Sequence, residues 1–279
     1  KDEEDKVLNN ASALWTRDKK DITSDQYKEF YHHVGMAYDD PWLTLHNKAE
    51  GLISYINLLF IPSNRPYDLF NPDRKANLKL YVRRVFITDD CEGLIPPYLR
   101  FVKGIIDTDD IDLNVSREML QNNPVVAKIK SAIIKRVISE LKKKANKEPE
   151  EFAKFWDAFG AVLKEGIHED FTNRDKILEV CRFKSSESDK LISLDDYVSR
   201  MKDGQEKIYY VSGEDENKLS QSPHLEGFKA KGIEVIYMTD PVDEFWLPSV
   251  GKYSEKDFQS ITKGGAELDK IKSGKKSKE

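Results

Sequence analysis

The longest periodic apolar pattern in the chain follows Asn123 and Pro124. Asn123 has the side chain of a helix N-cap, and proline is tolerated at the first helical position because the N–H group it lacks would have no partner there. Apolar residues then recur at intervals of three and four: Val126, Ile129, Ile133, Ile134, Val137, Ile138 and Leu141. This spacing predicts an amphipathic helix. Such a helix is stable only when another layer of the protein covers its apolar stripe.

A second helix is predicted to begin at Pro149, and one of its sides is aromatic. That side carries Phe152, Phe155, Trp156, Phe159, Val162 and Leu163. An aromatic stripe at helical spacing is more often part of a core than of a ligand site, so we interpret it as core. A third helix is predicted around Ile177, Leu178 and Cys181. We interpret residues 147–182 as a helical connector.

The residues before these helices alternate between strand and helix patterns. Thr23–Gln26 has the capping-box pattern of a helix start, and the apolar run 52–61 before Pro62 is typical of a buried strand. The apolar phase of residues 78–87 slips across Arg83-Arg84, which predicts a bulge or twist there. A helix is predicted from Pro96-Pro97 to Gly104, and a short strand at 105–106.

A compact strand–helix–strand pattern follows residue 193. Strands are predicted at 207–211 and 233–237, with a helix at 223–231 that ends at Gly232. A connection of this length implies that the two strands are parallel. The chain is therefore predicted to be an α/β protein with a large segment over 11–146 and a small segment over 183–263.

Length and composition agree with two packed units. A chain of 279 residues exceeds one average domain. Residues 1–10 are mostly charged and predict a linker, and residues 264–279 are polar and charged and predict a flexible tail. The missing initial methionine and the Lys/Ser/Gly-rich end indicate a fragment of a longer protein.

Several functional classes are disfavoured by composition. The net charge of −5 gives no basic footprint for nucleic acid, and no apolar run reaches the ~20 residues that span a membrane. Cys91 and Cys181 lack metal-ligand spacing, and no other metal pattern occurs, so we expect two free thiols and a cytoplasmic protein. The 14 glycines include neither a P-loop nor a Gly-x-Gly-x-x-Gly motif, so the chain is not expected to hydrolyse ATP alone.

A polar stretch over residues 112–121 carries the strongest candidate for chemistry. Ser116 has the side chain of an N-cap, which places Arg117 in the first helical turn, where a cation is electrostatically unfavourable. Gln121 lies four residues later and shares one face with Arg117. The arrangement is typical of half an anion site. The alternative is that Arg117 forms an ordinary ion pair with a nearby acid, which would be Asp109, Asp110, Asp112 or Glu118.

Long runs of the sequence resemble the middle domain of the Hsp90 chaperones, in particular the bacterial branch. The runs are residues 112–121 (Asp-Leu-Asn-Val-Ser-Arg-Glu-Met-Leu-Gln), 13–17, 79–87, 194–201 and 205–210. The resemblance implies two αβα sandwich segments joined by a short helical coil, which agrees with the α/β pattern above.

The same resemblance implies an auxiliary catalytic role for residues 112–121. Arg117 is similar to the residue that reaches the γ-phosphate of ATP, and Gln121 to a second residue placed near it. Asn114, Ser116 and Glu118 would support them. ATP and Mg²⁺ would be held by a preceding amino-terminal domain, and this chain alone would bind no nucleotide tightly.

The resemblance also implies binding of unfolded client proteins. Trp15 is similar to a client-contact position, and Glu244, Phe245 and Trp246 are similar to a second one, where we expect at least one ring to be exposed. Further implied partners are the amino-terminal ATPase domain, a carboxy-terminal domain that makes the full-length protein a homodimer, and a DnaK-type chaperone. The alternative function is a client-binding module without a catalytic contribution.

Overall fold

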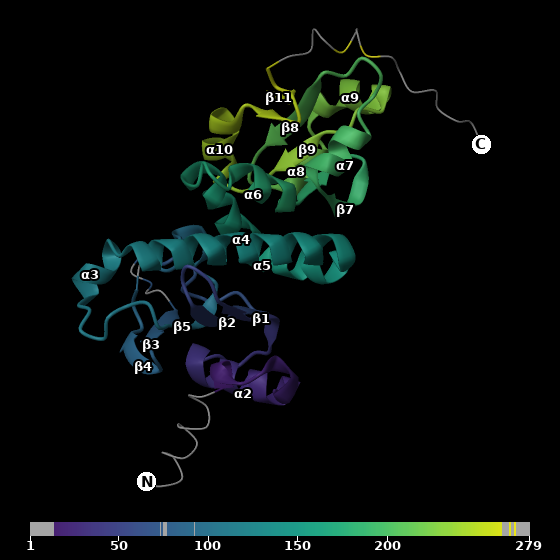
Figure 1. Ribbon diagram of the computed structural model, residues 1–279. Coiled ribbons are helices and arrows are strands. Elements are labelled where there is room, and N and C mark those ends of the chain that lie inside the picture. The colour runs from purple at the N-terminus through teal and green to yellow at the C-terminus, as the bar shows by residue number, and fades with distance from the viewer. Residues whose placement is uncertain are drawn as a thin grey trace. The chain divides into compact units, whose positions relative to one another are not determined.

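The computed structural model describes residues 14–72, 74, 77–91, 93–263, 268 and 271. The chain divides into two compact units: residues 1–140 with 157–159, and residues 141–156 with 160–279. The division falls within two long helices, α4 (Pro124–Lys147) and α5 (Pro149–Glu169), and the predicted connector over 147–182 falls in the second unit apart from residues 157–159 (Figure 1).

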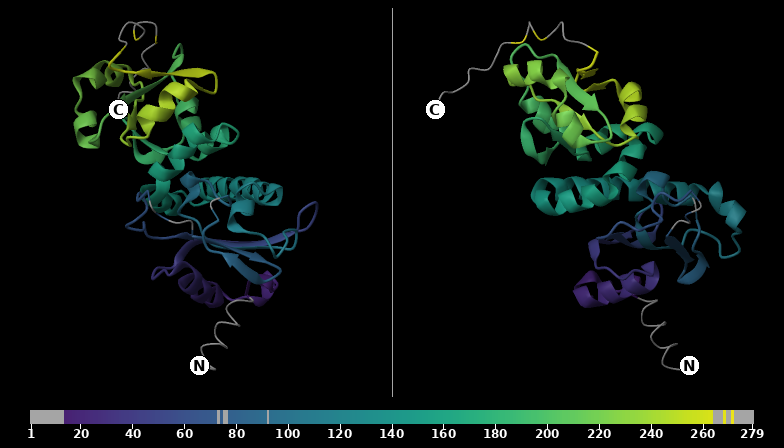
Figure 2. Two further views of the ribbon diagram at one scale, coloured as in Figure 1. Left: turned by 90° about the vertical axis from the view of Figure 1, so that its left-hand side faces the viewer. Right: turned by 180° about the vertical axis from the view of Figure 1, so that it is seen from behind.

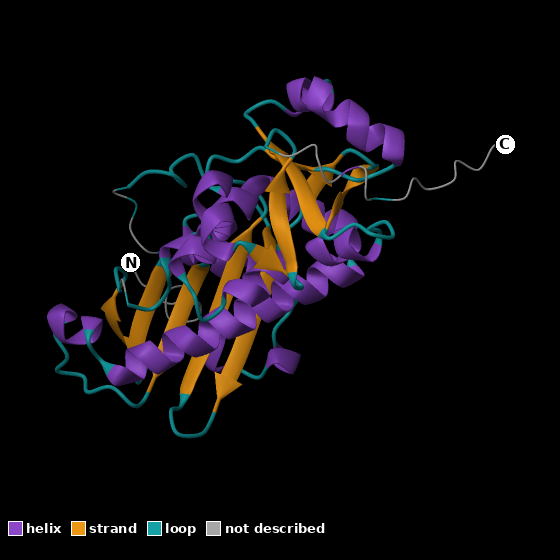
Figure 3. Cartoon of the chain, turned by 90° about the horizontal axis from the view of Figure 1, so that it is seen from above, coloured by secondary structure: helices purple, strands orange, loops and turns teal. Residues whose placement is uncertain are grey.

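The first unit contains a five-stranded sheet in the order β1-β2-β5-β3-β4. β3 and β5 are parallel, and the other neighbours are antiparallel. The strands are β1 (Pro41–Ala49), β2 (Tyr55–Pro62), β3 (Leu78–Val82), β4 (Val85–Thr88) and β5 (Lys103–Thr108). Figure 3 shows these strands side by side beneath a long helix.

Helices cover both faces of this sheet. Helix α2 (Ser24–Gly35) has the predicted capping box, in which Thr23 and Gln26 satisfy each other's backbone N–H groups. The helix packs Phe30 and Tyr31 against Leu58 and Phe60 of β2. Alternate residues of β2 point to the opposite face and are also buried, and α4 lies on that side (Figures 1 and 3). The unit is therefore a sandwich of helix, sheet and helix. Its short 3₁₀ helices are η1 (Leu14–Thr16), η2 (Lys19–Asp21) and η3 (Pro97–Leu99).

Gly104 is not the helix end that we predicted. The helical segment after Pro96 is only the short η3, and the chain enters β5 at Lys103. Gly104 has a φ of 134°, and a Cβ atom there would lie 2.1 Å from the carbonyl oxygen of Leu58 on β2. Glycine is required at this position because the neighbouring backbone passes too close for any side chain.

Arg83 and Arg84 form the turn of a tight hairpin between β3 and β4, where we predicted a bulge or twist. Both residues have positive φ values, 49° and 67°, which is the requirement of a type I′ turn. The apolar phase slips because the chain reverses there. The sequence signal was missed because such turns favour Asn-Gly, whereas arginine pays a steric penalty with positive φ.

Replacing Arg83 with Asn together with Arg84 with Gly is expected to stabilise the first unit by about 1 kcal/mol, because the turn strain is relieved. The backbone N–H groups of both residues bond to Thr108 and Asp107, and these bonds do not depend on the side chains. Urea unfolding of the chain measures the change. Alanine at both positions removes the charges but keeps the strain, and should change the unfolding free energy by less than about 0.5 kcal/mol. If the Asn-Gly pair and the Ala-Ala pair stabilise the unit equally, the gain comes from removing the two charges and not from relieving the strain of the turn.

The second unit contains a six-stranded sheet in the order β10-β11-β8-β9-β6-β7. The predicted parallel pairing of two strands is confirmed for β8 and β9, and β11 is also parallel to β8. The strands are β6 (Phe183–Ser185), β7 (Ser188–Ile192), β8 (Lys207–Ser212), β9 (Ile236–Met238), β10 (Lys252–Tyr253) and β11 (Lys256–Ser260).

Helices lie on both faces of this second sheet as well. Tyr209 of β8 packs against Phe228 of α9 (Glu226–Lys231), which ends as predicted at Gly232. On the other face Phe258 of β11 packs against Trp246 of α10 (Asp243–Val250). Both views in Figure 2 show helices on the two sides of this sheet. The remaining helices are α6 (Arg174–Val180), α7 (Leu194–Ser199), α8 (Glu216–Ser220) and η4 (Pro223–Leu225). The predicted fold class, two α/β sandwiches, is confirmed.

The predicted linker over 1–10 and nearly all of the predicted tail over 264–279 lie outside the described residues. Leu268 and Ile271 are described, and both pack into the core of the second unit. Within the described ranges, no helix is long and apolar enough to span a membrane.

Candidate functional site

Two buried leucine-sized side chains hold the polar stretch 112–121 against the first unit. Ile111 precedes the stretch and Leu120 lies near its end, and both are almost fully buried. Leu120 belongs to helix α3 (Arg117–Gln121), whose N-cap is Ser116 as predicted. The Ser116 hydroxyl accepts a hydrogen bond from the backbone N–H of Met119 over 3.4 Å. The helix is short, and its orientation depends on these two anchors.

Arg117 points to an acid that we did not predict. Its guanidinium forms an ion pair with Asp90, which follows β4, rather than with Asp109, Asp110, Asp112 or Glu118. The side chain of Arg117 remains 58% exposed, whereas that of Asp90 is 13% exposed. Exposed ion pairs contribute little to stability, so this pair is easily exchanged for another anion.

A small pocket brings Arg117 and Gln121 together. Asp90, Cys91, Gly93 and Leu120 complete its lining. Burial raises the pKa of the Cys91 thiol, which leaves the thiol protonated and a poor nucleophile at neutral pH. The pocket therefore offers a planar cation and an amide for an anion, and no group that would attack a substrate.

The supporting residues of the stretch are all at the surface. Asn114, Ser116 and Glu118 are exposed, and the pocket does not include them. The same stretch carries two exposed apolar side chains, Leu113 and Met119, with 45% and 62% of their surfaces exposed. Our sequence analysis did not single them out, although apolar residues inside a polar loop are a usable signal for a surface that another domain covers.

Trp15 does not lie where a client-contact residue must lie. Its side chain is only 2% exposed, and its indole N–H donates a hydrogen bond to the buried carboxylate of Asp107 over 2.8 Å. The ring also packs on Tyr81, with the two ring centres 4.8 Å apart. A buried ring offers no surface to a client. Trp15 is therefore a core residue, and we remove it from the candidate client site.

A buried histidine supports the backbone at Trp15. His46 Nε2 lies 2.8 Å from the Trp15 carbonyl oxygen and must donate to it, so that Nδ1 accepts from the Tyr27 hydroxyl, also over 2.8 Å. With this assignment both nitrogens have a partner in the neutral ring. Burial lowers the pKa of His46 below its ordinary value.

We expect acidification to destabilise the chain through His46. Below a pH of about 6.5 the unfolded chain takes up a proton on this ring, whereas the folded chain does not until the pH reaches the lowered pKa. Stability is therefore lost as the pH falls through this window, by up to about 1.4 kcal/mol per pH unit. Unfolding free energies measured from pH 8 to 5 for the wild type and for His46→Gln test this. The prediction is contradicted if the unfolding free energies of the two proteins change with pH in the same way.

The two adjacent aromatic residues of α10 face opposite directions. Trp246 is fully buried, whereas Phe245 is 66% exposed and Glu244 beside it is exposed. The expectation that at least one ring is exposed is confirmed, and the ring is that of Phe245. Trp246 was named with it as a client contact, but its burial against Phe183 and Phe258 makes it a core residue.

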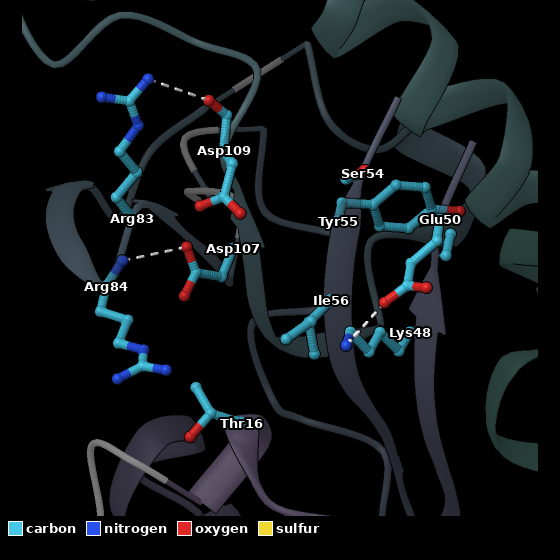
Figure 4. Close-up of a pocket in the computed structure, with 11 residues that line it drawn as sticks. Thr16, Lys48, Glu50, Ser54, Tyr55, Ile56, Arg83, Arg84, Asp107 and Asp109 are labelled. Atoms are coloured by element: carbon cyan, nitrogen blue, oxygen red, sulfur yellow. Dashed lines mark hydrogen bonds and ion pairs between the residues drawn. The ribbon is translucent and has the colours of Figure 1, made fainter. Parts of the chain in front are cut away.

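A pocket of about 760 Å³ in the first unit is lined by other residues and does not include Arg117. Charges of both signs line it, including Arg83, Arg84, Asp107 and Asp109 (Figure 4). Asp107 is already held there by the backbone N–H of Arg84 and by Trp15. Among the described residues, no three side chains of His, Cys, Asp or Glu gather as a metal site would require.

Comparison with known proteins agrees with the resemblance that residues 112–121 carry. The model of the family described as Hsp90 protein matches residues 1–279. The chain is 59% identical to the chaperone protein HtpG of Paramagnetospirillum magneticum over 271 residues, and 56% identical to that of Roseobacter denitrificans over 270 residues. Each alignment covers 97% of this chain but 44% of the relative, so the chain spans less than half the length of these relatives.

A solved structure has the same fold over most of the chain. It is the middle domain of a Plasmodium falciparum protein described as a heat shock protein, with a TM-score of 0.77 and 35% sequence identity. The likeness covers 90% of this chain and 99% of that one. Taken with the family match over all 279 residues, it shows that this chain belongs to the Hsp90 protein family.

Proposed function

We propose that this chain is the middle segment of an ATP-dependent chaperone and that Arg117 contacts the γ-phosphate of ATP held in a preceding amino-terminal domain. The observation that carries the proposal is the position of Arg117, which lines a shallow pocket with Gln121 and whose guanidinium pairs with Asp90 at the surface. A nucleotide phosphate brought to the exposed side of the guanidinium would replace Asp90 as its partner.

The chemistry proposed for Arg117 is electrostatic. During transfer of the γ-phosphoryl group, negative charge is spread over its equatorial oxygens, and a guanidinium stabilises that charge with two parallel N–H bonds. Gln121 would place its amide near the same group. Ser116 caps the helix that presents both side chains, and Glu118 and Asn114 complete the surface of the loop. Mg²⁺ and the adenine would be held by the other domain, and this chain would bind no nucleotide tightly by itself.

The exposed apolar side chains of the stretch 112–121 support contact with a second domain. Leu113 and Met119 belong to the same stretch as Arg117 and would be covered if the nucleotide domain docks there. In the full-length protein we place a carboxy-terminal dimerisation domain after this chain, and a DnaK-type chaperone among its partners. We propose that the protein works in the cytoplasm as a homodimer.

Binding of unfolded client protein is the second part of the proposal. Phe245 offers an exposed aromatic ring on α10, and Glu244 places a carboxylate beside it. An apolar anchor flanked by charge suits a partly folded chain, which exposes both kinds of group.

The alternative function is a client-binding module in which Arg117 has no catalytic part. The ion pair between Arg117 and Asp90 is the observation that favours it, because a merely structural arginine would be held in the same way. ATP turnover of the full-length chaperone with and without Arg117 separates the two functions: it collapses in the first and survives in the second.

A further inference from the structure

A buried cluster of charged residues lies behind α10 in the second unit. Lys164 of α5 is 3% exposed, and its Nζ atom lies 2.7 Å from Oδ1 of Asp243 and 2.6 Å from Oδ2 of Asp240. Asp243 is 1% exposed. Burial alone would lower the pKa of Lys164, but the two carboxylates outweigh it and raise that pKa, so the lysine carries its charge.

Asp243 connects this lysine to the ring of Trp246. Its Oδ1 atom also accepts a hydrogen bond from the Trp246 indole N–H over 2.8 Å, and its Oδ2 atom accepts one from the backbone N–H of Asp240 over 3.1 Å. Three donors therefore satisfy a carboxylate that is completely shielded from water. A buried network of this kind is costly when incomplete, because a carboxylate left without its partners is neither paired nor hydrated.

The buried side of α10 carries a charged residue, Asp243, beside the apolar Trp246 and Leu247. Successive helical residues are about 100° apart, so Asp243 and Trp246 share one side and Phe245 lies on the other. Rotation by one residue would place Phe245 where Trp246 now lies and would move Asp243 into the solvent position of Glu244. The same rotation would move the buried Leu247 into the exposed position of Pro248, so the apolar packing and the polar contacts of Asp243 favour the same orientation of α10.

We propose that Lys164 is a positioning residue: by pairing with Asp243 it holds α10 in the rotation that buries Trp246 and presents Phe245 to solvent. The inference rests on the proposed client binding through Phe245 for its functional meaning, but the rotation itself can be measured separately. Without Lys164 no cation pairs with the buried carboxylate of Asp243. Rotation of α10 would then bring this carboxylate into contact with water.

The test is a double-mutant cycle on the affinity of the chain for reduced, carboxymethylated α-lactalbumin, an unfolded protein whose blocked cysteines prevent refolding. Phe245→Ala is expected to weaken binding on the order of tenfold, as loss of an anchoring aromatic does. Lys164→Met should weaken it similarly, and adding Phe245→Ala to Lys164→Met should cause little further loss. Lys164→Met with Asp243→Asn should recover part of the affinity, because the neutral amide needs no cation and its oxygen still accepts from Trp246, although its NH2 group cannot accept from the backbone N–H of Asp240.

Lys154→Met is the matched control, since Lys154 is an exposed lysine of the same helix. It should leave binding unchanged. Equal losses from Phe245→Ala in the wild-type and Lys164→Met backgrounds would overturn the positioning role. No loss from Phe245→Ala in the wild type would instead overturn the client site.

Hydrogen exchange of the Trp246 indole N–H, assigned by its absence in Trp246→Phe, measures the rotation without a client. The proton should be protected in the wild type, exchange faster in Lys164→Met and be protected again in the variant that also carries Asp243→Asn. Unchanged protection in Lys164→Met overturns the inference whatever the client result. If Lys164→Met does not fold, Lys164→Gln takes its place in both measurements, because its amide removes the charge yet still donates to Asp243 and Asp240.

Discussion

Replacing Arg117 with alanine in the full-length chaperone is expected to lower ATP turnover by about 10³-fold, while ATP affinity and the fold change little. A contact that forms mainly in the transition state affects kcat more than binding, and loss of an arginine finger costs on this order. Arg117 is 58% exposed in its pair with Asp90, so the unfolding free energy should change by less than about 1 kcal/mol.

Two further variants make the measurement of Arg117 specific. Arg117→Lys should restore little turnover, because an ammonium cannot make the paired N–H contacts of a planar guanidinium. Lys128→Ala removes an exposed cation from the first turns of α4 and should leave turnover unchanged. Turnover near the wild-type rate in Arg117→Ala would support the salt-bridge interpretation and leave only client binding.

Local signals predicted the helices of both units because the determining contacts lie within a few residues. The Asn123 side chain accepts hydrogen bonds from the backbone N–H groups of Val125 and Val126, so the start of α4 at Pro124 depends on neighbours alone. The same holds for Ser116 and α3. The pattern of buried residues along α4 and α5 followed from their periodicity, since the stripe must face a sheet or another helix.

Features that depend on distant parts of the chain were not predictable in this way. Asp90 is 27 residues from Arg117, and only the hairpin of β3 and β4 brings the two side chains together. Nearer acids were therefore the reasonable but wrong candidates. The close approach of Leu58 to Gly104 likewise arises from the pairing of β2 with β5, which no local pattern of residues 96–104 contains.

The orientation of α10 shows the same limit within the candidate site. Phe245 and Trp246 are adjacent and both aromatic, so composition cannot assign the buried ring. Asp243 forms a buried contact on the same side as Trp246, and its partner Lys164 lies 79 residues earlier in the chain. Sequence reasoning reached the correct statement that both rings cannot point inward, and the structure supplies which of them does.

Truncating Trp246 to alanine is expected to destabilise the second unit by roughly 3–5 kcal/mol, the range for a large buried aromatic. The ring has no exposed surface, it packs between Phe183 and Phe258, and its N–H would leave one acceptor position of Asp243 empty. Thermal unfolding should therefore begin well below the wild-type temperature. Client affinity per folded molecule should change little, because the indole has no surface that a client reaches.

Truncating Phe245 is expected to have the opposite pair of effects. Because two thirds of the ring is already exposed, its removal should change the unfolding free energy by less than about 1 kcal/mol. Client affinity should fall on the order of tenfold, since the anchor is lost while Glu244 remains. Phe171→Ala is the matched control, because Phe171 is 71% exposed in the same unit and is not part of α10.

The comparison of the two rings separates a binding surface from a core. A binding ring and a core ring must respond differently to the same truncation, because exposed area contributes to association and buried area to folding. If Phe245→Ala unfolds at a lower temperature than the wild type, and if its folded molecules bind client with wild-type affinity, then Phe245 supports the fold and the client site lies elsewhere. If Phe171→Ala weakens client binding as much as Phe245→Ala does, exposed aromatic area in general binds the client, and α10 has no special part.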